Sequence, residues 1–67
     1  MTLSARNQLP GTVKSVVLGT VMAEVVVDCD GHELVSVITR HAVENLAIKA
    51  GDRVTVVMKA TEVLLEK

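Results

Sequence analysis

The chain has 67 residues and a formal net charge of −1, with seven Lys and Arg against eight Asp and Glu. A chain of this length holds one hydrophobic core, which predicts a single domain over residues 1–67 and excludes a multidomain enzyme. The near-neutral charge provides no overall field that would attract nucleic acid or an anionic membrane, so any bound anion must be held locally.

The apolar composition is unusual because Phe, Tyr and Trp are all absent, although hydrophobic residues make up 49% of the chain. Nucleic-acid bases then have no aromatic side chain on which to stack, and we expect no nucleic-acid partner. The large side chains that dominate many cores are also missing. We therefore expect a homo-oligomer, in which contacts between chains complete a small core.

Cys29, the only cysteine, excludes a disulfide within the chain and a multi-cysteine zinc site, and we expect a small, partly buried thiol in a reducing compartment. No apolar run approaches the roughly 20 residues of a membrane span. Residues 1–6 lack the apolar centre of a secretion signal. The expected location is the cytoplasm, with no membrane partner.

β-branched residues recur with period two and predict three strands, over residues 11–17, 21–28 and 33–39. In the first strand, Val13 and Val17 are expected on one face and Lys14 and Val16 on the other. Three successive valines at 25–27 indicate that the second strand is buried on both faces.

Two turns separate these strands. The first turn contains Gly19, which can adopt a positive φ, and the second contains Asp30 and Gly31, a pair that favours a tight hairpin.

One short helix is expected after Thr39, a plausible N-cap, with Ala42, Val43 and Leu46 on its buried side. Two further strands are predicted over residues 53–58 and 62–65, with a break at residues 59–61. The order predicts an all-β fold: a small OB-like five-stranded barrel with its helix between strands three and four.

Catalysis is poorly supported. His32 and His41 have no neighbouring serine elbow, cysteine or paired carboxylates from which a nucleophile and a base could be assembled. Cys29 and His32 have a ligand-like spacing, but nothing nearby completes a set of three or four ligands, so no metal-cation site is expected. The acidic residues around the second turn are expected to form a solvated hairpin end: Glu24, Asp28, Asp30 and Glu33.

The positions of the charged residues are more informative than the net charge. Up to Ala23 the only charged side chains are Arg6 and Lys14, and residues 59–61 add a cation and a hydroxyl at a break between strands. Donor-rich segments without nearby carboxylates can bind an oxyanion. From composition alone, the alternative is that these residues are simply solvated.

Two segments carry a family resemblance. Residues 4–11, Ser-Ala-Arg-Asn-Gln-Leu-Pro-Gly, and residues 59–63, Lys-Ala-Thr-Glu-Val, resemble the signature segments of the molbindins, or Mop proteins, which are single-domain members of the TOBE group. The resemblance covers essentially the whole chain. It implies an OB-like barrel that exchanges strands with a neighbour and assembles as a hexamer, a trimer of dimers.

The same resemblance implies a function without catalysis and without a cofactor. Molbindins bind molybdate or tungstate at subunit interfaces, and are thought to store the oxyanion for molybdenum-cofactor synthesis, whose proteins are possible partners. Carried over to this chain, one strip of the principal site comprises Ser4, Arg6 and Asn7 with the backbone of Ala5. A neighbouring chain adds Lys59, Ala60 and Thr61.

A second class of oxyanion site is expected near the three-fold axis. Its candidate residues lie in one turn and at the helix start: Gly19, Thr20, Thr39, Arg40 and His41. This chain departs from the family pattern at Pro10, where many relatives have Lys. That change removes a donor and stiffens the segment that enters the first strand.

Two other functions are compatible with the sequence. The same fold can act as an oxyanion-sensing interaction module that signals through a protein partner. An OB-type RNA binder is the third reading, and the missing aromatic residues and the net charge of −1 oppose it.

Overall fold

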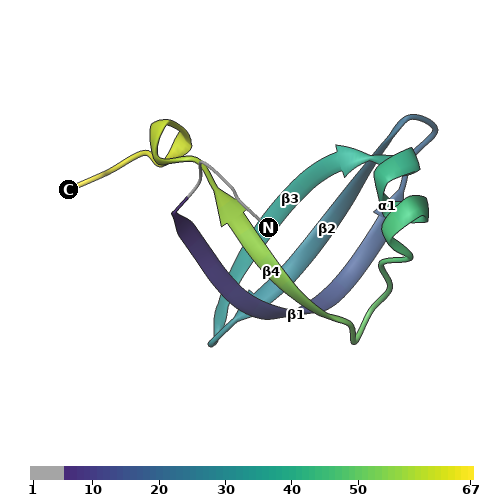
Figure 1. The fold of residues 1–67 in the computed structure, drawn as a ribbon, viewed down its shortest axis with the longest axis horizontal. Helices are drawn as coiled ribbons and strands as arrows, with labels where there is room; N and C mark the ends of the chain where they lie inside the picture. The colour runs from purple at the N-terminus through teal and green to yellow at the C-terminus, as the bar shows by residue number, and fades with distance from the viewer. Residues whose placement is uncertain (1–5) are drawn as a thin grey trace.

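The computed structural model describes residues 6–67, and four of its segments form one antiparallel sheet in the order β3-β2-β1-β4 (Figure 1). The elements in chain order are β1 (Asn7–Leu18), β2 (Met22–Cys29), β3 (His32–Thr39), α1 (Arg40–Leu46), β4 (Arg53–Met58) and the 3₁₀ helix η1 (Ala60–Glu62). The expected mostly-β fold with one short helix between the third and fourth strands is confirmed. No helix in residues 6–67 is long and apolar enough to cross a membrane.

β1 is longer than predicted because it serves two partners. Its second part pairs with β2, from Thr12 opposite Asp28 to Leu18 opposite Ala23. Its first part, the polar segment expected to precede the strand, pairs with β4. Main-chain hydrogen bonds need no apolar alternation, so hydropathy gave no sign of this pairing. We call residues 7–12 and 53–58 the ribbon.

A β-bulge corrects the predicted faces of β1. Val13 pairs with Val27, but the next pair is Ser15 with Val26, so Lys14 is an extra residue in the ladder. One extra residue reverses the alternation beyond it. Val13 is consequently buried at 2% exposure while Val17 is 63% exposed, and the prediction that they share a face was wrong.

The two turns before β3 have different causes. Asp30 and Gly31 have φ angles of 54° and 85°, the backbone that a tight two-residue hairpin requires, and this prediction is confirmed. The glycines with positive φ are Gly31 and Gly51, so the expectation for Gly19 was wrong. Gly19 is required for space instead, since a Cβ there would lie 2.8 Å from the carbonyl oxygen of Met22.

Helix α1 begins as predicted. The Thr39 hydroxyl accepts a hydrogen bond from the backbone N–H of Ala42 at 3.0 Å. Val43 is buried, but Leu46 is 68% exposed, so its predicted place on the buried side was wrong. The helix ends immediately afterwards at Ala47, whose φ of 52° is left-handed. Leu46 is therefore the last residue of the helix, and its side chain does not pack against the sheet.

The core is small and consists of short side chains. Its buried members are Val13, Ala23, Val25, Val27, Cys29 and Val43. The thiol of Cys29, expected to be partly buried, is buried within this core. Of the three successive valines, Val26 lies on the opposite face of β2 and is only partly buried.

The predicted fifth strand over residues 62–65 is absent from the described chain. The segment begins within the 3₁₀ helix and continues as an extended tail (Figure 1), with Leu64 91% and Leu65 95% exposed. A strand needs a neighbouring strand for its N–H and C=O groups, and residues 6–67 provide none for this segment. The sheet has four strands in this single chain.

Candidate functional site

The two signature segments meet at one end of the molecule. Asn7 pairs with Met58, which places Arg6 and Lys59 one residue beyond the ladder on adjacent strands. Figure 1 shows the start of β1 and the end of β4 at this end. The expectation assigned residues 59–61 of the site to a neighbouring chain; the ladder also places this chain's own copy beside Arg6. Ser4 and Ala5 lie outside the described residues.

The cations at this end are exposed and available. Neither Arg6 nor Lys59 forms an ion pair with any residue between 6 and 67. By contrast, Arg40 has a carboxylate partner in Glu44. Two positive charges without carboxylate partners generate a local potential that favours an anion.

The turn after β4 adds further donors. The first hydrogen bonds of η1 run from the N–H of Glu62 to the Lys59 carbonyl at 2.9 Å and from the N–H of Val63 to the Ala60 carbonyl at 3.3 Å. The N–H groups of Ala60 and Thr61 precede these bonds and have no acceptor within the turn. The exposed Thr61 hydroxyl lies on the same turn. This end therefore combines main-chain, hydroxyl and cationic donors.

The residues expected for a second site are also brought together. Met22 pairs with Thr39, which joins the β1–β2 turn to the start of α1. Arg40 donates from Nη1 to the Gly19 carbonyl at 3.3 Å, and its N–H donates to the Val21 carbonyl at 2.8 Å. A shallow depression here is lined by Thr20, Val21, Thr39, Arg40, His41 and Glu44.

Sequence reasoning missed Glu44 as a member of this depression. Its carboxylate lies 3.8 Å from Nε of Arg40, one helical turn earlier. The i,i+4 spacing along a helix was the available signal. The side chains of His41 and Asn45 form a hydrogen bond, with 3.1 Å between Nε2 of His41 and Nδ2 of Asn45. Because a carboxylate repels an anion and pairs with Arg40, this depression offers less net positive charge than the end of the ribbon.

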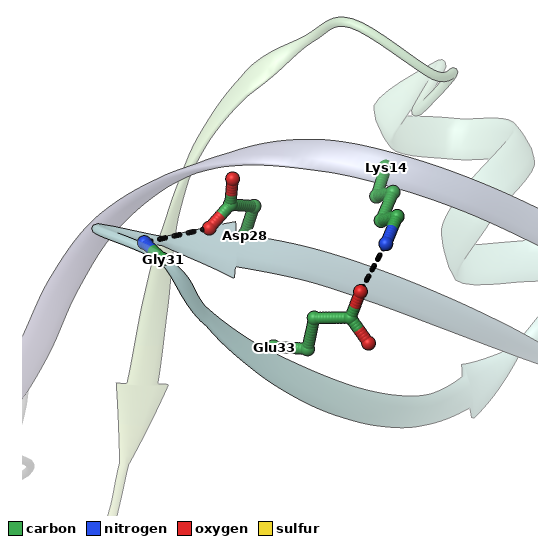
Figure 2. Close-up of polar contacts among 4 residues, drawn as sticks. All are labelled: Lys14, Asp28, Gly31 and Glu33. Atoms are coloured by element: carbon green, nitrogen blue, oxygen red, sulfur yellow. Dashed lines mark hydrogen bonds and ion pairs between the residues drawn. The ribbon is translucent and has the colours of Figure 1, made fainter.

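Two acidic residues of the hairpin, Asp28 and Glu33, have partners close by, as Figure 2 shows. Lys14 forms an ion pair with Glu33, and the Gly31 N–H donates to Oδ1 of Asp28 at 2.9 Å. The hydrogen bond from Lys14 to Glu33, together with the negative charge of that carboxylate, raises the pKa of Lys14 above its usual 10.5. These residues stabilise the hairpin and leave no free positive charge for an anion.

A cavity of about 830 Å³ lies between the first part of β1 and the β2–β3 hairpin. Leu9, Pro10, Cys29 and Leu34 form its apolar lining, and His32 and Arg53 also border it. Across residues 6–67, no three His, Cys, Asp or Glu side chains are grouped so that they could hold a metal ion.

The TOBE domain family model matches residues 3–65. The chain belongs to the TOBE domain family. Its relatives include Molybdenum-pterin-binding protein 3 of Clostridium pasteurianum, 42% identical over 97% of both chains. A probable molybdenum-pterin-binding protein of Haemophilus influenzae is 39% identical and covers 97% of this chain and 96% of its own. The resemblance inferred from the two signature segments is confirmed.

Solved structures agree with this assignment. A molybdate-binding protein from Sporomusa ovata superposes with a TM-score of 0.96 at 49% identity over the full length of both chains. MopII from Clostridium pasteurianum gives 0.92 at 40% identity, over 98% of this chain and 100% of its own. ModG with molybdate bound, described as a cytoplasmic molybdate-binding protein, gives 0.84 at 44% identity, over 90% of this chain and 43% of its own.

Proposed function

We propose that this TOBE chain binds molybdate at the end of the ribbon. The observation that carries the proposal is the pairing of Asn7 with Met58, because the next residues beyond this pair are Arg6 and Lys59, cations that form no ion pair within residues 6–67. Its relatives support this ligand, since they include the molybdate-binding protein of Sporomusa ovata and Molybdenum-pterin-binding protein 3 of Clostridium pasteurianum. Ser4 and Ala5 join Arg6 and Asn7 as the first strip of the proposed site.

The proposed donors suit a tetrahedral dianion. Arg6 and Lys59 offset its charge, the hydroxyls of Ser4 and Thr61 donate hydrogen bonds, and backbone N–H groups, including that of Ala60, serve the remaining oxygens. Phosphate is disfavoured because it is partly protonated near neutral pH, and a site made only of donors leaves that proton without an acceptor. Tungstate has the same charge and shape as molybdate, so it is expected to bind as well.

A second copy is proposed to complete both the core and the site. The edges of β3 and β4 are unpaired in the described chain, and an apolar trough next to them is lined by residues that include Val25, Ile38, Ile48 and Val56. The tail of residues 62–65 exposes two leucines that such a trough would bury. Exchange of this tail between copies would supply the missing fifth strand.

Tail exchange also places the partner subunit's motif at the site. The motif of residues 59–61 immediately precedes the exchanged tail, so docking of the tail would hold this motif between the two chains while Lys59 stays next to Arg6 of its own chain. The full proposed assembly is a hexamer, a trimer of dimers, with further oxyanions near the three-fold axis at the depression around Arg40.

The proposed role is storage of the oxyanion, with no catalysis and no cofactor. The described residues of the site offer hydrogen-bond donors and positive charge, and we place no nucleophile or acid–base pair there. A cytoplasmic location and delivery to molybdenum-cofactor synthesis proteins are part of the proposal, and the description of ModG as cytoplasmic supports the location.

Native mass spectrometry during a sodium molybdate titration tests the binding site. Arg6→Ala and Lys59→Ala are each expected to weaken binding about ten-fold or more, because a charge-assisted hydrogen bond contributes about 1.5–3 kcal/mol. Lys49→Ala removes an exposed cation elsewhere and is the matched control. Sulfate and phosphate are the control anions. Native affinity in both variants would refute the site.

The subunit count from the same spectra tests tail exchange. Leu64→Ser combined with Leu65→Ser is expected to yield monomers, because polar side chains would replace the two leucines buried on docking. Val35→Ser changes an exposed aliphatic residue of β3 outside the trough and is expected to retain the hexamer. An unchanged hexamer in the double serine variant would contradict exchange of the tail.

A further inference from the structure

β1 changes partner at one point along its length. Going along β1 from its start, Thr12 is the last residue that pairs with β4, opposite Arg53. It is also the first residue that pairs with β2, opposite Asp28. Every residue of β1 before Thr12 pairs only with β4. The ribbon therefore leaves the rest of the sheet at Gly11 and Thr12 and carries the proposed site at its far end.

Gly11 lies where the backbone of β1 passes directly over the end of β2. A Cβ at this position would lie 2.6 Å from Cγ1 of Val27, 2.7 Å from Sγ of Cys29 and 3.0 Å from the carbonyl oxygen of Asp28. The φ angle of Gly11 is not positive, so backbone conformation alone does not demand glycine there. The missing side chain provides space for a close approach of two strands.

We infer that Gly11 is a positioning residue for the oxyanion site. The inference rests on the proposed function. The ladder of the ribbon is continuous from Thr12 opposite Arg53 to Asn7 opposite Met58, so a displacement at the crossing is transmitted to Arg6 and Lys59. β4, which borders the trough for the partner's tail, moves with it. Gly11 thereby sets where Arg6 and Lys59 together lie relative to the rest of the sheet and to the docked tail of a partner subunit.

The direct test is Gly11→Ala, titrated with sodium molybdate and followed by native mass spectrometry. The expected result is about ten-fold weaker molybdate binding or more with the assembly retained, because sites of this kind require their groups within about 0.5 Å of the productive geometry. A crystal structure of the variant is expected to show the ribbon displaced relative to β2 and β3. Native affinity in this variant would overturn the inference.

Two further variants separate steric displacement from loss of stability. In a Val27→Ala/Cys29→Ala background, both side-chain clashes are removed, and Gly11→Ala is expected to weaken molybdate binding much less than in the native chain. Gly51→Ala strains a φ of +93° without any contact to its new Cβ, so it is expected to lower stability and leave molybdate affinity unchanged. Equal losses in both backgrounds, or an equal loss in Gly51→Ala, would overturn the inference.

Failure of the proposed function gives a different result. If the native chain takes up no molybdate, the function proposed above is refuted while the structural part of the inference is still decided by crystallography. A Gly11→Ala structure with the ribbon in its native place would refute the positioning role, whatever the ligand.

Discussion

The two halves of this small sheet differ in how completely they are covered. In the body, where β2 lies between β1 and β3, Val25 is 2% exposed. In the ribbon, β4 has a single neighbour, its inward-facing valines are only partly buried, and Val57 is exposed. In the tail that follows, Leu64 and Leu65 are almost fully exposed.

The difference shows that a valine can be fully buried in a central strand and remain partly or largely exposed in an edge strand. A central strand is covered on both sides by other strands, whereas an edge strand leaves one row of backbone groups and one flank of its side chains open. This chain is folded as a body with an incomplete extension, and the incomplete part holds the proposed site. The following predictions test that contrast.

The largest effect is expected for a truncation in the body. Val25→Ala should lower the free energy of unfolding by about 2–3 kcal/mol, because it removes buried apolar surface and leaves a cavity. The same change at Val57 of the ribbon should cost about 0.5 kcal/mol or less in the separated chain. Urea denaturation of both variants in the Leu64→Ser/Leu65→Ser background gives the comparison. Equal costs would contradict the division into body and extension.

A change at the hairpin of the body should have a smaller effect. Gly31→Ala places a Cβ in open space but at a φ of +85°, so only backbone strain of about 1–2 kcal/mol is expected. Gly31→Asn should recover part of the loss, since asparagine tolerates this conformation better. The measurement is again the urea midpoint, and an undiminished midpoint in Gly31→Ala would contradict the strain argument.

Loss of the helix cap should cost about 1 kcal/mol. Thr39→Ala removes the oxygen that accepts from the Ala42 N–H, and Thr39→Ser should retain most of the stability. Thr55→Ala in the ribbon is the matched control, since Thr55 caps no helix. Thermal unfolding followed by circular dichroism measures the three variants. A loss in Thr39→Ser as large as in Thr39→Ala would argue against the cap.

The smallest effect concerns the exposed pair of Lys14 and Glu33. Because its pKa is raised in the folded state, Lys14 contributes stability below its unfolded pKa of about 10.5, and this contribution is lost as the pH rises through the higher folded value. Glu33→Gln should return the titration of Lys14 toward its usual range, which NMR of the lysine side chain can follow. High salt should reduce the small stability difference between the two proteins. A Lys14 titration unaffected by Glu33→Gln would contradict the pairing.

Several features could be predicted from the sequence because their causes are local. The hairpin at Asp30 and Gly31 forms because both residues accept a positive φ. The helix begins where it does because the Thr39 hydroxyl accepts a hydrogen bond from the N–H three residues later. The valine-rich segments identified most of β1, β2, β3 and β4. The two signature segments are sufficient to identify the family from sequence alone.

Other features depend on residues far apart in the chain. The bulge at Lys14 is a property of the β1–β2 ladder, and it decided which of Val13 and Val17 is buried. Hydropathy could not reveal it, because the pattern of β1 alone is compatible with either face. The exposure of Leu46 depended on where α1 ends.

The sequence by itself determined the strand-rich fold, the local turns and the family of this chain, because backbone preferences and side-chain donors act over a few residues. Only the tertiary structure decided that the polar segment from Asn7 joins β4, that Arg6 and Lys59 follow the last pair of that ladder, and that Gly11 lies tightly against the end of β2. It also decided that residues 62–65 form no strand within the described chain. Pairing between distant strands satisfies backbone hydrogen bonds collectively, and no single segment specifies its partner.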